Sequence, residues 1–563
     1  MTHDGAEGGL AALKKLSDRQ QSRQAGHRLD ARPNPAKRPD PRLGSIRADP
    51  ETESIEEIFP FPIYRPMPKA ISRPPDHRAP RRQRDELPAR IAIAMLAGAM
   101  ALGALLRLTG IGNQPGWQSD EPVYTAIAAN VALHGTLNDH IQVGMSWAPF
   151  LFHPPFYMLL LAGWFKLFGV GIPQARTLSV LASLLMFGLL ARLIWRLHGP
   201  VVTVLTLMLV IFDGWLSYVQ RVSYIENTLI LIVVAALVCY ERALRRRSAV
   251  GFILAGAMLG FVVAFKHTGL YVLAAVALNW LIIRQDGKKH LLMGGAAATV
   301  IGLYVAGMTW LFDFGPHRWY IAQSIIQIER VFGARQSRGT LGSPLKFLHL
   351  LTHQYAIFIP SLIVAIACFV MLARRAIQCT RRRSFEPVRA NSLLFSWGTA
   401  GIIVFGASQL RFQQYFVLVL VPMYCYFWTE LFRIARKRPA RLTAIVAIAA
   451  TIGIAGVGSF YSRVLTHNDN ALRQVKQYVH NRIPPSDVII TEEEIGDEIQ
   501  QQWCSVARAG ACRWSASYAI TYRTFLQPIA PPGDTAFALI MKAAKPVASF
   551  TGFKEVITVW RLH

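Results

Sequence analysis

The sequence QSDEPVYTAIAANVALHG, from Gln118 to Gly135, comes just after the first long apolar run of the chain. It is followed by a polar connection and by FHPPFY, which contains His153. Asp120 and Glu121 are adjacent carboxylates at the start of an amphipathic run. Carboxylates beside hydrocarbon are costly, because a charge that leaves water loses its hydration. They stand either in an ordinary wet loop or in an active site that needs a base at this depth.

The composition indicates a membrane protein. The chain has 563 residues, of which 52% are hydrophobic and 17% are charged. Apolar runs of about twenty residues, the length that crosses a bilayer, recur between Ile91 and Tyr461. A net charge of +27 would suggest a nucleic-acid partner in a soluble protein. In a membrane protein, Lys and Arg collect in cytoplasmic loops, so we expect no nucleic-acid partner.

The chain divides into three predicted regions. Residues 1–88 are rich in Arg and Pro and have few long apolar side chains, so they cannot offset their ordering entropy by burial. We expect this region to be a disordered basic tail in the cytoplasm. Residues 89–461 are the predicted membrane domain, and residues 462–563 are a predicted soluble domain on the outer side.

The positive charges set the topology. If the short run from Pro155 to Val170 crossed the membrane, every later Lys/Arg cluster would lie outside, against the positive-inside rule. If this run lies flat in the interface, those clusters all lie inside. The flat placement predicts an all-α membrane domain with eleven spans. They lie near 91–108, 175–196, 200–218, 226–243, 249–266, 268–284, 291–312, 353–374, 391–409, 414–433 and 441–461.

This topology brings polar residues to one membrane face. Asp120, Glu121 and His153 lie in the first outer loop. Three outer turns contribute the others, which are Arg221 with Glu226, Lys266, and Arg411. The plainer interpretation of each residue alone is an interfacial anchor. Their coincidence favours a site, because the positive-inside rule predicts few cations on the outer face.

Sugar transfer from a lipid phosphate would need such a set. A carboxylate can deprotonate the acceptor hydroxyl. The leaving phosphate is already acidic, so no general acid is needed, in contrast to glycoside hydrolysis. Fixed cations hold the phosphate and absorb its developing charge. The lipid tail of the donor keeps that phosphate at the interface.

Six segments carry a resemblance to a known family: SDEPVYTAIAANVALHG, HPPFYMLLLAGWFKLFG, ARTLSVLASLL, RVSYIENTLI, GFILAGAMLGFVVAFKHTGL and LRFQQYFVLVLVP. Together they resemble the protein O-mannosyltransferase and aminoarabinose–lipid A transferase family, over roughly residues 90 to 435. The resemblance implies the GT-C fold, amphipathic helices along the outer face after the first span, and a polyprenyl-phosphate sugar donor.

The resemblance also implies roles for residues. Asp120 matches the catalytic acidic residue and Glu121 its companion, while Lys266 and Arg411 match cations near the lipid phosphate. Glu226 stands where the family usually has Asp, and Phe412 where a Tyr is common. Taken together, motif and charge predict Asp120 and Glu121 as catalytic. The predicted substrate-binding residues are His153, Arg221, Glu226, Lys266 and Arg411.

Several alternatives stay open at this stage. A transporter or lipid-linked sugar flippase would place ionisable groups near the bilayer midplane, where Asp213 is the one candidate. The sugar is not specified, and the acceptor could be a glycolipid, lipopolysaccharide, polysaccharide or protein of the envelope. The outer loops contain no compact zinc motif. We therefore expect no metal cofactor. A divalent cation that bridges the donor phosphate is the alternative to this expectation.

The region 462–563 predicts a compact α/β unit outside the inner membrane of a bacterium. NDNALRQVKQYVHNRIP is predicted as a helix, and DVIITEE, AFALIMK and VITVWRL as strands. Of the six cysteines, only Cys504 and Cys512 fall in this region. Export to an oxidising compartment predicts a disulfide between them.

Overall fold

The computed structural model describes residues 88–112, 114, 120–137, 153–312, 358–407, 413–435, 438–466, 471–491, 493–496, 499, 501–506, 515–524, 535–551 and 555–562. The predicted tail 1–88 therefore lies outside the described residues, except for Pro88. So do residues 313–357 and Arg411.

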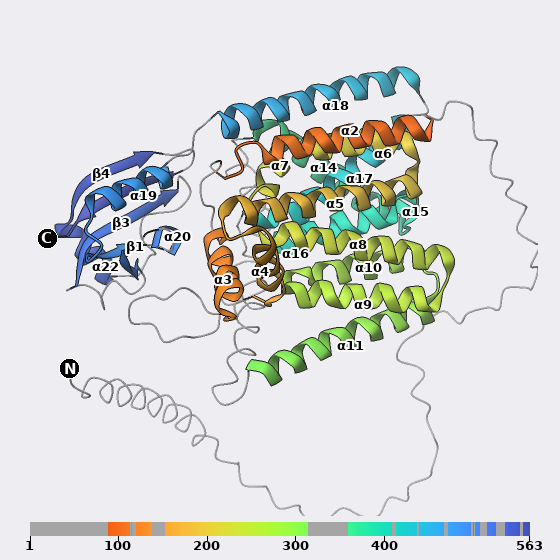
Figure 1. Cartoon of the computed structure of the whole chain (residues 1–563). Helices are drawn as coiled ribbons and strands as arrows, with labels where there is room; N and C mark the ends of the chain where they lie inside the picture. Colours follow the sequence, from red (N-terminus) through yellow and green to blue (C-terminus); the bar gives the residue numbers. More distant parts are fainter. Residues whose placement is uncertain are drawn as a thin grey trace, which may run out of the picture. The chain divides into compact units, whose positions relative to one another are not determined.

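Long apolar helices run side by side and form the membrane domain (Figure 1). Their bounds are α2 Ala89–Leu108, α5 Ile172–His198, α6 Pro200–Ile211, α7 Gly214–Gln220, α8 Ile225–Arg246, α9 Ala249–Phe265, α10 Leu270–Ile283, α11 Gly287–Phe312, α14 Ile359–Arg382, α16 Ser392–Ala407, α17 Phe416–Ala435 and α18 Pro439–Phe460. Short helical turns join or extend them at η1 His267–Gly269, α15 Glu386–Arg389, η3 Gln413–Tyr415 and η4 Tyr461–Leu465.

Among the described residues, seven helices are long and apolar enough to cross a membrane. The pair α6 and α7 makes an eighth candidate, bent by 66° at its break. Asp213 lies at that break and caps α7, because its Oδ1 accepts a 2.8 Å hydrogen bond from Leu216 N. The three other predicted spans correspond to the shorter helices α9, α10 and α16. The protein is thus a multi-pass membrane protein, while the count of eleven stays a prediction.

Two helices depart from this arrangement. They are α3 (Glu121–His134) and α4 (Phe156–Phe168), which pack against each other at one end of the bundle. Figure 1 shows α3 running across the direction of α5 and α8, with α15 at the opposite end. The 13 residues of α4 span about 20 Å as a helix, which is too short to cross roughly 30 Å of hydrocarbon. Its length agrees with a helix that lies in the interface.

Close helix contact in the bundle depends on small residues. Gly256 and Gly260 of α9 face the backbone of α11 at Met293 and Ala297, and a Cβ atom at either glycine would overlap those carbonyl oxygens. The two backbones can approach because no side chain separates them.

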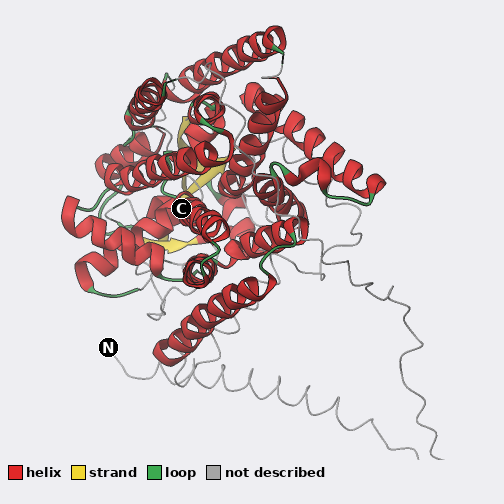
Figure 2. Ribbon diagram, turned by 90° about the vertical axis from the view of Figure 1, so that its right-hand side faces the viewer, coloured by secondary structure: helices red, strands yellow, loops and turns green. Residues whose placement is uncertain are grey.

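The C-terminal unit is a small sheet domain. Its strands are β1 Val488–Thr491, β2 Gln502–Ser505, β3 Ala516–Thr524, β4 Lys545–Thr551 and β5 Glu555–Arg561. Their order in the sheet is β2-β1-β3-β5-β4, in which β1 is parallel to both neighbours and β5 is antiparallel to both of its own. In Figure 2 the described strands (yellow) appear near the C-terminus and are overlapped in this view by helices. The predicted α/β class of the domain is confirmed.

One predicted strand of this domain is wrong. AFALIMK lies in helix α22 (Thr535–Ala543), whose Phe537 packs on one face of the sheet against Ile490 and Ala519. The segment is a continuous run of apolar residues without the alternation of a half-buried strand, and Ala, Leu and Met favour helix. Helix α19 (Ala471–Arg482) packs on the other face, against Ile520 and Ile557. A short helix, α20 (Glu493–Gly496), contacts α3.

Candidate active site

Asp120 immediately precedes α3, at the end of the bundle where α3 and α4 lie. Pro122, at the start of the helix, suits a position whose N–H would have no helical partner. One turn later, Tyr124 donates a 3.1 Å hydrogen bond to Asp120 Oδ2. Gln414 Nε2, in η3, donates a 3.0 Å hydrogen bond to the same oxygen. Asp120 is only half-buried, so it is a carboxylate that is held in orientation and still reached by solvent.

The neighbouring carboxylate, Glu121, is in a different state. It is fully buried and paired with Arg176 of α5 through two hydrogen bonds of 2.8 and 2.7 Å. Ser223 N also donates to Glu121 Oε1, at 2.8 Å. Both oxygens of this carboxylate are therefore occupied by donors from within the protein. The arrangement suits Glu121 to fixing the start of α3, which positions Asp120.

A second buried ion pair joins α8 and the end of α9. Lys266 Nζ lies 2.6 Å from Glu226 Oε1, and both side chains are at most 2% exposed. Glu226 Oε2 is buried and has no hydrogen-bond partner among the described residues. The ammonium group also lies 5.2 Å from the centre of the Tyr415 ring, which fits a cation–π contact.

Aromatic side chains connect these groups. Tyr124 makes edge contacts with His153 and Tyr157, with ring centres 5.8 and 5.9 Å apart. Tyr157 exchanges a 2.8 Å hydrogen bond with Ser223. Burial raises the pKa of Tyr124 well above its usual range, and the negative charges of Asp120 and Glu226 add to this effect. The Tyr124 hydroxyl therefore stays protonated and remains a donor to Asp120.

Arg221 lies in the turn after α7 and faces the chain that leads from α2 towards Asp120. Its terminal nitrogens donate to Leu106 O, Thr109 O and Gln114 O at 3.1, 2.7 and 2.6 Å. These carbonyls belong to the end of α2 and the loop beyond it, so the guanidinium satisfies backbone groups that the helix itself leaves unpaired.

Six of the seven predicted site residues thus lie in one connected region: Asp120, Glu121, His153, Arg221, Glu226 and Lys266. Arg411 lies outside the described residues. The sequence interpretation missed Tyr124, Arg176, Gln414 and Tyr415. A signal existed for Arg176, because an arginine inside an apolar helix needs a partner. Gln414 and Tyr415 follow Arg411 in LRFQQYF, but nothing in that string identifies their contacts.

Among the described residues, no group of three or more His, Cys, Asp or Glu side chains is arranged to hold a metal ion. In the C-terminal unit, Cys504 is disulfide-bonded, whereas Cys239, Cys368, Cys379 and Cys425 are free. The predicted partner, Cys512, lies outside the described residues, so that pairing stays a prediction.

This chain is similar to known proteins in sequence and in fold. Residues 152–311 match the family model described as dolichyl-phosphate-mannose-protein mannosyltransferase. The fold is similar to ArnT from Cupriavidus metallidurans bound to undecaprenyl phosphate, with a TM-score of 0.55 and 14% identity over 84% of this chain and 98% of that chain. It is also similar to the oligosaccharyltransferase of Archaeoglobus fulgidus, with a TM-score of 0.50 and 15% identity over 75% of this chain and 67% of that chain. No curated protein sequence matches.

These similarities confirm two predictions. The solved structures share the GT-C fold with this chain. The family match, which runs from Phe152 through α11, confirms the enzyme class as glycosyltransferase.

Proposed function

We propose that this chain, a glycosyltransferase of the GT-C fold, moves a sugar from a polyprenyl-phosphate donor to an acceptor on the outer face of the cytoplasmic membrane. One observation carries the proposal. Asp120, the half-buried carboxylate, is oriented by Tyr124 and Gln414 at the end of the bundle where the buried ammonium group of Lys266 also lies.

The reaction needs a base and a stabilised leaving group. Asp120 accepts the proton of the acceptor hydroxyl as its oxygen bonds to the anomeric carbon of the sugar. The bond between that carbon and the phosphate oxygen breaks, and the lipid phosphate leaves with the electron pair. It needs no proton, because its charge is spread over the phosphate and balanced by cations. Lys266 and Arg411 are the proposed cations.

The other residues have supporting roles in this proposal. Glu121 is a positioning residue, because its two oxygens already accept from Arg176 and Ser223. Glu226 keeps a buried oxygen without a partner among the described residues, which suits it to accept from a sugar hydroxyl. His153 contributes to the wall beside Tyr124. Arg221 acts through the backbone it holds.

The donor class follows from the relatives and from chemistry. ArnT of Cupriavidus metallidurans was solved with undecaprenyl phosphate. A polyprenyl tail in the bilayer would bring its phosphate to the end of the bundle, at the depth of α3 and α4. We propose that no metal takes part in the step. The acceptor is an envelope glycolipid, lipopolysaccharide, polysaccharide or protein.

A transporter or flippase is not favoured. The one carboxylate that suggested it, Asp213, caps α7 and so has a structural explanation at the bend between α6 and α7. Such a protein would also have no need for an oriented base at the membrane surface.

The test compares envelope glycolipids and glycoproteins by mass spectrometry in cells that lack the gene and in cells that carry a variant. Asp120→Asn keeps the size of the side chain and removes its charge, so transfer should fall by about 10²- to 10⁴-fold. The control is Asp286→Asn, between α10 and α11 at the other end of the bundle, which should restore the wild-type products. Full activity of Asp120→Asn would reject Asp120 as the base. The same products in cells with and without the gene would reject the transferase proposal.

A further inference from the structure

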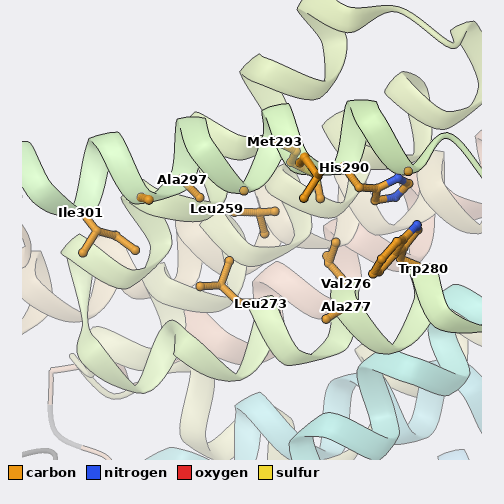
Figure 3. Close-up of a pocket in the computed structure, with 13 residues that line it drawn as sticks. Leu259, Leu273, Val276, Ala277, Trp280, His290, Met293, Ala297 and Ile301 are labelled. Carbon is orange, nitrogen blue, oxygen red and sulfur yellow. The ribbon is translucent and has the colours of Figure 1, made fainter. Parts of the chain in front are cut away.

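A cavity of about 330 Å³ lies between α10 and α11 and reaches from Leu273, in the first turn of α10, to Gly287, where α11 begins. Leu259 of α9, Leu273 and Val276 of α10 and Ile301 of α11 line its apolar length. Figure 3 shows Ile301 at one end of this groove and Trp280 with His290 at the other.

The groove exists because its walls carry small side chains. Gly294, Ala297 and Ala298 on α11 and Ala277 on α10 are among its lining residues. A Cβ atom built at Gly294 would meet no atom within 4 Å, so none of the described residues fills this space. Since α11 is largely exposed elsewhere, with only 17% of its apolar window buried, the groove opens on the side of the bundle that faces hydrocarbon.

The length of the groove matches one leaflet. From His290 to Ile301 a helix rises about 16 Å, and half of the hydrocarbon core is roughly 15 Å thick. Trp280 stacks on His290, with ring centres 5.8 Å apart, at the end where a membrane interface would lie. Both nitrogens of His290 have partners, Asp286 O and the Tyr240 hydroxyl, which fixes the ring at the rim.

Cations surround that rim. Arg284 lies in the connection between α10 and α11, and Lys288 and Lys289 lie in the first turn of α11, directly after Gly287, which lines the cavity. Asp286 is the one acidic residue of the connection, and Lys289 pairs with it at 2.9 Å. Lys288 and Arg284 are exposed, and the helix N-terminus adds partial positive charge.

We propose that this groove binds one anionic glycerophospholipid of the leaflet opposite the proposed active site. One acyl chain lies along α10 and α11, and the phosphate lies at Lys288 and the start of α11. The apolar length of the groove suits an acyl chain that spans one leaflet. The positive charge of the rim selects an anionic head group. The lipid fills the space between α11 and α10 and so holds α11 in place.

The test is native mass spectrometry of the full-length protein in detergent with added phosphatidylglycerol or phosphatidylcholine. Gly294→Leu adds a side chain to the lining of the groove, at a position where a Cβ atom meets nothing within 4 Å, and should weaken phosphatidylglycerol retention roughly tenfold, since two or more buried methylenes are lost. Gly295→Leu is the matched control, because its Cβ atom also meets nothing within 4 Å but Gly295 does not line the cavity. It should bind as the wild type does.

A second variant tests the head group. Lys288→Gln combined with Lys289→Gln should weaken phosphatidylglycerol retention by about fivefold for each removed cation and leave phosphatidylcholine unchanged. Equal retention by Gly294→Leu and Gly295→Leu would overturn the proposed groove. Equal retention of the two lipids by the wild type would overturn the head-group assignment. If polyprenyl phosphate displaced phosphatidylglycerol from the wild type but not from Gly294→Leu, the groove would be a site for polyprenyl phosphate. That result would overturn the proposed glycerophospholipid.

Discussion

Gln414 Nε2 donates a 3.0 Å hydrogen bond to Asp120 Oδ2, although 294 positions separate the two residues in the chain. The first lies in η3 before α17, and the second lies at the start of α3. Tyr124 donates to the same oxygen from within α3. One donor is therefore local and the other comes from a distant turn, and both fix the plane of the proposed base.

Replacement of these donors should slow transfer without removing the base. A hydrogen bond to a charged group contributes about 1.5–3 kcal/mol, so Gln414→Met should lower the transfer rate by at least about tenfold. Tyr124→Phe should have a similar effect. Because both donors act on one oxygen, their effects in the double variant should not add. The control is Gln285→Met, which is exposed between α10 and α11. Wild-type rates for both single variants would show that the two hydrogen bonds have no part in catalysis.

The pair Lys266–Glu226 should behave as a unit in stability. Glu226→Ala leaves a buried cation without its partner, which costs about 3–5 kcal/mol of unfolding free energy. Glu226→Met combined with Lys266→Met removes both charges and should recover most of the lost unfolding free energy. Transfer should be lost in this double variant, because the proposed cation is absent. Thermal unfolding in detergent and an activity assay on the same samples separate the two effects. An unchanged melting temperature for Glu226→Ala would show that Lys266 is not held by this pair.

The proposed topology places the sheet domain and the candidate active site on the same side of the membrane. Alkaline phosphatase fused after Thr466, at the end of η4, should be active because it would be exported. A fusion after Arg247, in the turn between α8 and α9, should be inactive. The reverse pattern of activities would invert the topology and move Asp120 to the cytoplasmic face.

The bond at Cys504 should link it to Cys512. In denatured protein that has not been reduced, a thiol reagent should modify only Cys239, Cys368, Cys379 and Cys425, which serve as internal controls. Reduction should expose two further thiols and destabilise the domain by about 2–3 kcal/mol, as expected for a short loop. Labelling of Cys512 before reduction would assign Cys504 another partner.

Much of the architecture could be predicted from local patterns. Apolar length predicted the membrane helices, and the distribution of Lys and Arg predicted that α4 lies flat, with which its length of 13 residues agrees. AFALIMK shows where this approach fails. The length of a short apolar run does not separate strand from helix, and the helix propensity of Ala, Leu and Met was the signal that should have been weighed.

The sequence by itself determined that Asp120, Glu121, Glu226 and Lys266 lie at one end of the bundle, because the end at which a residue lies follows from the length and charge of the segments around it. Only the tertiary structure decided what each group does there. Glu121 and Asp120 are adjacent in sequence, yet one is buried against Arg176, 55 positions away, and the other keeps access to solvent. Which partner neutralises a charge depends on distances of a few ångströms between helices, and those distances arise only when the helices pack.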